Sequence, residues 1–290
     1  KFWRQCCIMS NKDKNSRVRV RGESQINPGI FTGKKLIYGM IHLLPLPGTP
    51  FYESGNVEKS LEKAIADVKA LIAGGADGCV IQTIDQIYPV GQDVDPARLA
   101  SFAIIVKAVK DHSHKDFHVG VQILWNALEA SLAVAKTCGG VFVRSNALVG
   151  STMTAAGVAE SDPISLTEYR NKIDAHDVSL LAEIESMHFS WLNGKPLVDV
   201  AAEAIRVGTN GVEIAHPEED VCLSMISQLK DKYPELPVII GGHTNHENAA
   251  RILAKADGAL VGSCFEPQGW GSNVDESKVA EYVDIVRNIS

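Results

Sequence analysis

Short apolar runs alternate with amphipathic segments along most of this chain. The first apolar run, residues 36–41, precedes the segment 57–73, in which Leu61, Ile65 and Val68 recur at the spacing of one helix face. The same alternation continues almost to the last residue, with little linker between elements. Strands buried between two layers of helices are typical of parallel sheets, so the pattern predicts an α/β fold. The predicted strands are 36–41, 79–81, 119–124, 141–144, 180–184, 212–214, 238–240 and 259–261.

Helices are predicted in the intervals between these strands. Asp95-Pro96 gives one of them an N-cap followed by proline at the first helical position. Glycine-rich turns, such as Gly-Gly-Ala-Asp-Gly at 74–78, end several helices and lead into the next strand. The other predicted helices are 57–73, 126–136, 165–176, 197–207, 219–231 and 275–289.

Eight strand–helix units favour a closed (β/α)₈ barrel of the TIM type. The competing fold is an open, doubly wound sheet, which is less favoured because no Gly-x-Gly-x-x-Gly motif follows the first strand. Four long segments come directly after predicted strands, which places them at the C-terminal, catalytic face of a barrel. These segments are 42–56, 83–94, 145–164 and 185–196.

Charge divides the chain into two parts. Nine of the 28 Lys and Arg residues lie in 1–35 with two acidic residues, so the remainder carries 19 basic and 33 acidic side chains. We therefore predict a basic extension at 1–35, either disordered or a mitochondrial targeting segment, and one barrel domain at 36–290. The acidic body argues against nucleic acid as a partner. No apolar run is long enough to span a bilayer.

The six cysteines show no Cys-x-x-Cys motif and no metal-ligand spacing. Several of them lie in or beside apolar runs, where a free cysteine behaves as a small hydrophobic residue. This usage favours a reducing compartment, either the cytoplasm or the mitochondrial matrix.

The last two predicted strands both end in small residues. Gly241-Gly242 follows 238–240, and Gly262-Ser263 follows 259–261. Glycine lets backbone N–H groups approach an anion, and a helix predicted to start beside each of these strand ends supplies free donors. TIM barrels often hold phosphate in the loops after their final two strands. We predict a phosphate site here; the alternative is that the glycines only fit tight turns. The predicted phosphate-binding residues are Gly241, Gly242, Gly262 and Ser263.

Polar side chains also end the earlier strands. His42 opens a stiff, proline-rich loop and is a candidate acid or base. In a closed barrel Glu183 and Glu213 converge near the mouth, where burial displaces carboxyl pKa values. Such acids can instead form a structural ion pair with Arg144, a residue that can otherwise hold an anion. No cofactor or metal is predicted, because the first strand lacks a His-x-His pair. The predicted catalytic residues are His42, Glu183 and His188, and the predicted substrate-binding residues are Gln82, Asp85, Asn126, Arg144, Asn146, Glu213 and His243.

The segment Gly-Met-Ile-His-Leu-Leu-Pro-Leu-Pro-Gly-Thr-Pro at 39–50 closely resembles the opening motif of the BtpA family. The likeness covers roughly residues 36–288 and includes Val143-Arg144-Ser145-Asn146 and Ile240-Gly241-Gly242. The resemblance implies a (β/α)₈ fold related to ribulose-phosphate-binding barrels. The family includes a photosystem I biogenesis factor and a sugar-operon protein, and its members lack a settled reaction.

Several charged positions depart from the family pattern. Gln82-Thr83 replaces the usual Glu-Asn, Trp125-Asn126-Ala127 replaces Arg-Asn-Asp, and Thr154-Ala155-Ala156-Gly157 replaces Thr-Asp-x-Gly. Glu183 stands in place of Asp, and Met187-His188 in place of Lys-His. Losing a carboxylate removes both proton transfer and charge stabilisation. The chain has therefore changed its substrate or kept binding while losing catalysis.

These observations support three hypotheses. The first is a barrel that binds a phosphorylated sugar or nucleoside-like metabolite and acts as a lyase, isomerase or nucleosidase. The second is a non-catalytic assembly factor, and the third is a metal-dependent hydrolase. The outer helices of such barrels often mediate self-association, so a homo-oligomer is compatible with each hypothesis.

Overall fold

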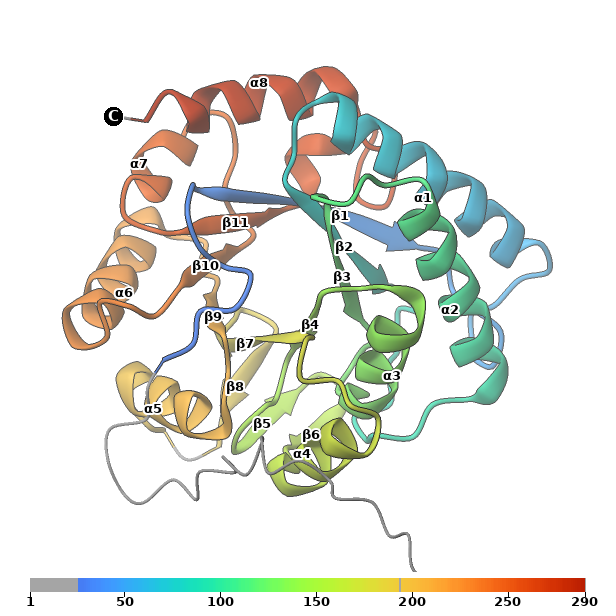
Figure 1. Ribbon diagram of the computed structural model, residues 1–290, viewed down its shortest axis with the longest axis horizontal. Coiled ribbons are helices and arrows are strands. Elements are labelled where there is room, and N and C mark those ends of the chain that lie inside the picture. The colour runs from blue at the N-terminus through green and yellow to red at the C-terminus, as the bar shows by residue number, and fades with distance from the viewer. Residues whose placement is uncertain (1–25, 193, 290) are drawn as a thin grey trace, which may run out of the picture.

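Eight parallel strands form a closed barrel surrounded by helices (Figure 1). The structure is a computed structural model that describes residues 26–192 and 194–289. Going round the barrel, the strands follow one another in chain order, and β1 pairs with both β2 and β11. This closure confirms the predicted TIM barrel and excludes the open sheet. The predictions for residues 1–25 lie outside the described part of the chain. The barrel strands are β1 Leu36–Leu43, β2 Gly78–Thr83, β3 His118–Gln122, β4 Phe142–Ser145, β7 Ser179–Glu185, β9 Gly211–Ile214, β10 Val238–Gly241 and β11 Gly258–Val261.

The helices pack around this barrel with their apolar faces inward. Asp95 caps α2 as predicted, because its side chain accepts hydrogen bonds from the amides of Ala97 and Arg98. The helices are α1 Asn56–Ala73, α2 Pro96–Asp111, α3 Leu128–Cys138, α4 Pro163–Lys172, α5 Leu197–Val207, α6 Glu219–Lys232, α7 Ala249–Leu253 and α8 Glu276–Arg287, with a 3₁₀ turn η1 at Ser263–Phe265.

The buried face of α1 differs from the predicted one. Val68 is fully buried as expected, but Leu61 and Ile65 are only partly buried, and Leu71 occupies the core instead. Leu71 lies against Gly39 of β1, where any β-carbon would collide with its methyl groups. The missing side chain at Gly39 therefore leaves room for Leu71 in the core.

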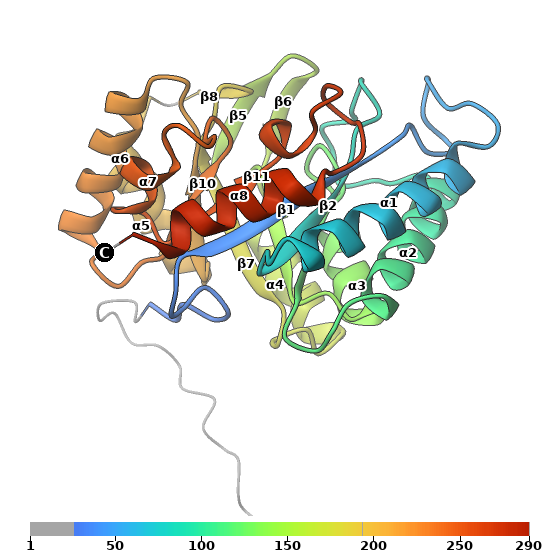
Figure 2. The same ribbon diagram turned by 90° about the horizontal axis from the view of Figure 1, so that it is seen from above.

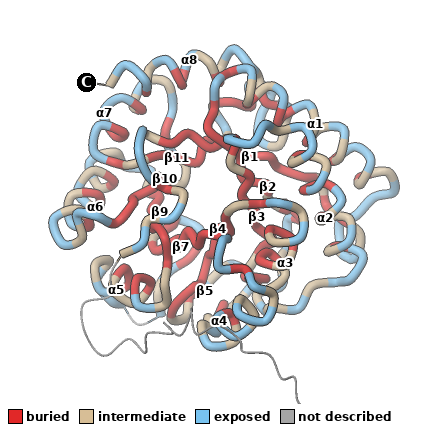
Figure 3. Tube along the Cα trace, viewed as in Figure 1, coloured by how far each residue is buried: buried red, intermediate tan, exposed pale blue. Residues whose placement is uncertain are grey.

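The residues facing the inside of the barrel change character along each strand. Toward the N-terminal end they are apolar and form one buried cluster that includes Tyr38, Phe142 and Leu181. Two residues further along the same strands the side chains are polar: His42 follows Met40, Arg144 follows Phe142 and Glu183 follows Leu181. Because side chains alternate across a strand, these polar residues also point into the barrel. Figure 3 shows the strands as a buried ring inside more exposed helices.

Residues 26–35 close the N-terminal end of the barrel. Phe31 is 3% exposed and packs edge-on against Phe142, with ring centroids 5.4 Å apart. The side chain of Asn210 donates to the carbonyl of Asn27 at 2.9 Å and ties the segment down. Figure 2 shows this segment, in blue before β1, and the β5–β6 hairpin at opposite ends of the barrel.

The predicted long loops at 145–164 and 185–196 contain a small antiparallel sheet. It consists of β5 Ser151–Thr154, β6 Gly157–Glu160 and β8 Phe189–Trp191, in the order β6-β5-β8. The indole of Trp191 donates to the carbonyl of Ile184, which anchors the sheet to the end of β7. Among the described residues no helix is both long and apolar enough to cross a membrane.

Candidate functional site

A pocket of about 630 Å³ opens at the C-terminal ends of the barrel strands. This is the end at which TIM barrels carry their active sites. Ten of the fourteen residues predicted for the site line the pocket, although they come from six different strand ends. These are His42, Gln82, Arg144, Asn146, His188, Gly241, Gly242, His243, Gly262 and Ser263.

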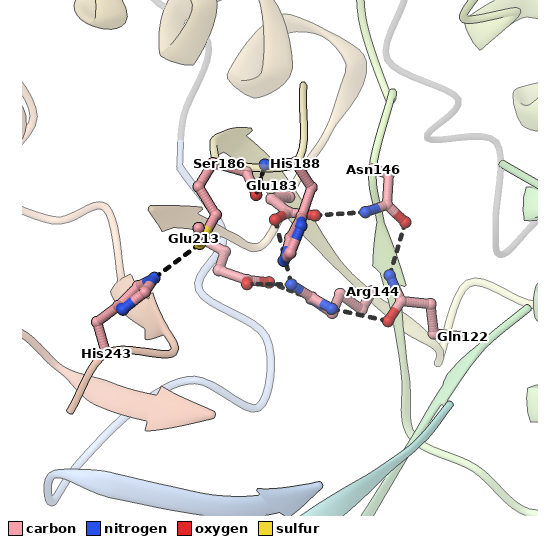
Figure 4. A network of polar contacts seen from close by, with 9 residues as sticks. Gln122, Arg144, Asn146, Glu183, Ser186, His188, Glu213 and His243 are labelled. Atoms are coloured by element: carbon pink, nitrogen blue, oxygen red, sulfur yellow. Dashed lines mark hydrogen bonds and ion pairs between the residues drawn. The ribbon is translucent and has the colours of Figure 1, made fainter. Parts of the chain in front are cut away.

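Arg144 is the centre of a polar network beneath the pocket (Figure 4). Its Nε and Nη2 atoms donate to the two carboxylate oxygens of Glu213, both at 2.6 Å. Its Nη2 also lies 3.2 Å from Glu183, and its Nη1 donates to Gln122 at 2.9 Å. The side chain of Asn146 accepts from Gln122 and donates to Glu183, which completes the network. Most Arg144 donors are thus used within the protein, as the structural alternative anticipated.

The two carboxylates lie behind this arginine and do not line the pocket. Burial raises the pKa of Glu213 to about 7; Arg144 opposes this rise and Glu183 adds to it. Burial alone would lower the pKa of Arg144, but Glu183 and Glu213 together raise it. The network therefore keeps its arginine charged and holds a proton that titrates near neutrality.

His188 and His243 both line the pocket, and each is influenced by charges around it. Burial and the positive charge of Arg144 lower the pKa of His188. Burial and the neighbouring His188 lower the pKa of His243, whose Nε2 lies 3.0 Å from the sulfur of Met187. Both imidazoles are therefore neutral at pH 7 and can each accept or donate one hydrogen bond.

His42 lines the pocket beside Gly262. Its Nδ1 contacts Oε1 of Glu266 at 2.9 Å, and the ring of Trp270 lies over it with centroids 5.3 Å apart. Glu266 and Trp270 lie in the segment between η1 and α8. Neither was predicted from the sequence, because nothing in that segment marks one residue as a partner for His42.

The predicted phosphate glycines have different structural roles. A β-carbon at Gly241 would collide with the carboxylate of Glu213, so this glycine makes room for the network. Gly242 has φ +106° and open space around the position of a β-carbon. A β-carbon at Gly262 would lie 3.3 Å from Cε1 of His42. Close packing thus accounts for Gly241, while Gly242 and Gly262 border the pocket.

The predicted helix start beside Gly242 is wrong. Helix α7 begins only at Ala249 and has five residues, so a loop separates it from the end of β10. Any anion at Gly242 would therefore depend on loop amides and not on a helix dipole.

Asp85 and Asn126 lie outside the pocket lining. Asp85 is fully buried, accepts from the amide of Leu46 at 3.0 Å and pairs with Arg98. Asn126 is also buried and donates to the carbonyl of Glu160 at 3.1 Å. Both side chains hold loops in place at the mouth, and this explains their burial without a ligand.

Other pocket residues were missed by the sequence analysis. Trp125 lines the wall next to His188, with ring centroids 6.5 Å apart. Thr244 follows His243 and accepts from the hydroxyl of Tyr282 at 2.9 Å. Within 26–192 and 194–289 no three His, Cys, Asp or Glu side chains form a group that could hold a metal.

The barrel is similar in shape to distant solved structures. It superposes on tryptophan synthase from M. tuberculosis with a TM-score of 0.59, 15% identity, and coverage of 91% of this chain and 100% of that one. It superposes on N-(5'-phosphoribosyl)anthranilate isomerase from Pyrococcus furiosus with a TM-score of 0.53 and 13% identity, and the match covers 88% of this chain and 99% of that one. At such identities the likeness establishes the fold alone.

The sequence is similar to curated proteins over most of its length. An uncharacterised protein of Archaeoglobus fulgidus is 29% identical over 255 residues, which cover 86% of this chain and 98% of the relative. The photosystem I biogenesis protein BtpA of Synechocystis is 27% identical, with 86% of each chain covered. An uncharacterised mitochondrial protein of Caenorhabditis elegans is 28% identical, with 89% and 95% covered. The model of the BtpA family matches residues 33–288, so this chain belongs to the BtpA family.

Proposed function

We propose that the barrel binds a phosphorylated sugar or nucleoside-like metabolite in the pocket at its C-terminal end. The observation that carries the proposal is the position of two glycine-containing loops, at Gly242 and Gly262, on the wall that also holds His42. The same small molecule can therefore place an anion against these loops and a reacting group beside the imidazole of His42.

The backbone around Gly242 supports an anion seat. Gly242 and His243 both have positive φ, +106° and +59°. Neither amide donates to a backbone carbonyl within the described segments. A non-glycine residue in this conformation is strained, and such strain concentrates at ligand sites. The hydroxyl of Ser263 and that of Thr244 supply further donors beside these amides.

The opposite wall is suited to the rest of the metabolite. Gln82 and Asn146 present amides to the pocket, which match sugar hydroxyls as donors and acceptors. The indole of Trp125, with the ring of His188 edge-on to it at an interplanar angle of 81°, supplies an aromatic surface. This division supports a ligand with an anion at one end and a sugar or planar ring at the other. The reaction classes that fit are lyase, isomerase and N-glycosidic cleavage.

The test measures thermal and chemical stability with inorganic phosphate and ribose 5-phosphate as probes. At about 100 times its Kd a probe should stabilise the protein by about 2.7 kcal/mol. Gly242→Asp should abolish this gain, because its carboxylate would repel the anion. Gly208→Asp is the matched control, since Gly208 has φ +97°, an equally open surrounding and a place at the C-cap of α5. An equal response in both variants would contradict the proposal.

A non-catalytic assembly role is the second candidate. One curated relative is named a photosystem I biogenesis protein. On the added sheet and beside it, Met153, Val158 and Leu192 are exposed apolar side chains, which are typical of contact surfaces. Retention of a partner protein by the wild type, with no response to either phosphate probe, would favour this role.

A further inference from the structure

His42 and Glu266 lie 224 residues apart in sequence and meet in the wall of the pocket. Their exposed fractions are 5% and 2%, so water barely reaches either side chain. Nδ1 of His42 lies 2.9 Å from Oε1 of Glu266, a normal hydrogen-bond distance. A carboxylate has no hydrogen to donate, so the hydrogen in this bond belongs to Nδ1.

We propose that His42 is the acid–base catalyst of the pocket and that Glu266 is its positioning residue. Glu266 holds the imidazole in the form protonated at Nδ1, which leaves the lone pair of Nε2 for the ligand. This inference rests on the proposed function for the identity of the ligand, but the state of His42 can be measured without one.

The segment that carries Glu266 is held rigidly. The second carboxylate oxygen of Glu266, Oε2, accepts from the amide of Gly271 at 3.1 Å. The backbone carbonyl of Glu266 accepts from the amide of Gly269 at 3.0 Å, and the amide of Asp275 donates to the carbonyl of Phe265. Both oxygens of Glu266 are therefore engaged, and the side chain cannot rotate away from His42 without breaking a second bond.

The charges around the pair are balanced. Asp67 of α1 is the nearby acidic group; burial raises its pKa, and Glu266 contributes to that rise. Asp67 is itself paired with Lys63 and accepts from the amide of Val274. Lys63 thus offsets Asp67, and Glu266 remains available to stabilise a positive charge on His42.

The other two histidines of the pocket lack this arrangement. Nε2 of His243 contacts the sulfur of Met187, and the backbone amide of His188 donates to the hydroxyl of Ser186. No carboxylate contact is recorded for either ring within the described residues. His42 is therefore the pocket histidine whose tautomer is set by an anionic partner.

The position of His42 also indicates which hydrogen of the ligand it would remove. The ring is beside Gly262, in the wall assigned to the phosphate, and Trp270 covers it. The acidic hydrogen should therefore lie on an oxygen or carbon close to the phosphorylated carbon of a sugar phosphate. Nε2 accepts that proton while the bonding pair stays on the substrate, and the imidazolium formed, paired with Glu266, returns the proton later.

The test uses ¹⁵N-labelled histidine and long-range ¹H–¹⁵N spectra of the full chain at pH 8, without ligand. His42 should be protonated at Nδ1 and unprotonated at Nε2. In Glu266→Gln, which keeps the size of the side chain, the ratio of Nδ1–H to Nε2–H forms should fall by about tenfold, because a neutral partner binds the N–H less strongly. His112 is the internal control, since its Nδ1 contacts the carbonyl of Ala108 at 2.8 Å and no carboxylate.

A wild-type His42 protonated at Nε2, or an unchanged ratio in Glu266→Gln, would overturn the inference. The wild-type spectrum alone gives the first answer, so the test survives a variant that fails to fold. In a second sample, labelled uniformly with ¹⁵N, adding ribose 5-phosphate should move the amide signals of Gly242 and Gly262. If these signals do not move while the tautomer result holds, the proposed ligand is wrong and the His42–Glu266 pair stands.

Discussion

The two ends of the barrel are built from the same strands and have opposite chemistry. On β4 the inward residue near the N-terminal end is Phe142, and two positions further it is Arg144. On β7 the same step leads from Leu181 to Glu183. The N-terminal end is closed by aromatic packing, whereas the C-terminal end holds buried charges and an open pocket.

This difference separates stability from function within one scaffold. Apolar burial at the N-terminal end removes surface from water and stabilises the fold directly. The ion pairs at the C-terminal end lose hydration on burial, and their mutual attraction only partly offsets that loss. Arg144, Glu183 and Glu213 therefore contribute less to the stability of the fold than their close contacts suggest.

The largest effect is expected from removing the guanidinium at the mouth. Arg144→Met should lower the free energy of unfolding by about 4 kcal/mol, because it leaves Glu183 and Glu213 buried without a counter-charge. Chemical denaturation measures this loss. Arg251→Met is the control, since Arg251 forms an exposed pair with Glu219. If Arg144→Met is as stable as the wild type, as Arg251→Met is expected to be, Arg144 is not the required counter-charge of Glu183 and Glu213.

The next effect concerns the aromatic end. Phe142→Ala should lower the free energy of unfolding by about 3 kcal/mol, because it opens a cavity beneath Tyr38 and Phe31. The gain in unfolding free energy that ribose 5-phosphate gives to Phe142→Ala should equal the gain that it gives to the wild type. A lost response would show that the two ends are coupled and would break the comparison.

Taken over one pH unit, the smallest effect is the dependence of stability on pH. The pKa of Glu213 is about 7 in the fold and ordinarily 4.5, so the folded chain keeps a proton that the unfolded chain releases. Stability conferred by this proton is complete below pH 4.5 and declines as pH rises toward 7, by at most about 1.4 kcal/mol per pH unit. Denaturation across this range should show a shallower slope for Glu213→Gln and an unchanged slope for Phe142→Ala. A steeper slope in Glu213→Gln would contradict the titration.

The sequence was sufficient for the fold because its signals are local and repeated. Asp95-Pro96 predicted the start of α2, and glycine-ended helices predicted the turns into β2 and β9. Strand ends also identified ten of the residues that line the pocket, since parallel strands bring their C-terminal ends to one side of a barrel. The small sheet at 151–160 and 189–191 was missed because its strands have three or four residues each, too few to show a period.

Only the tertiary structure decided how these residues are used. Asp85 and Asn126 stand at strand ends like Arg144, yet they hold loops, because their neighbours Arg98 and Glu160 come from elements elsewhere in the chain. The contact of His42 with Glu266 likewise joins β1 to the segment before α8. Hydrophobic periodicity records which face of each element is buried and therefore determines the barrel. The pairing of individual polar groups depends on distances between remote segments, and those exist only after the barrel has closed.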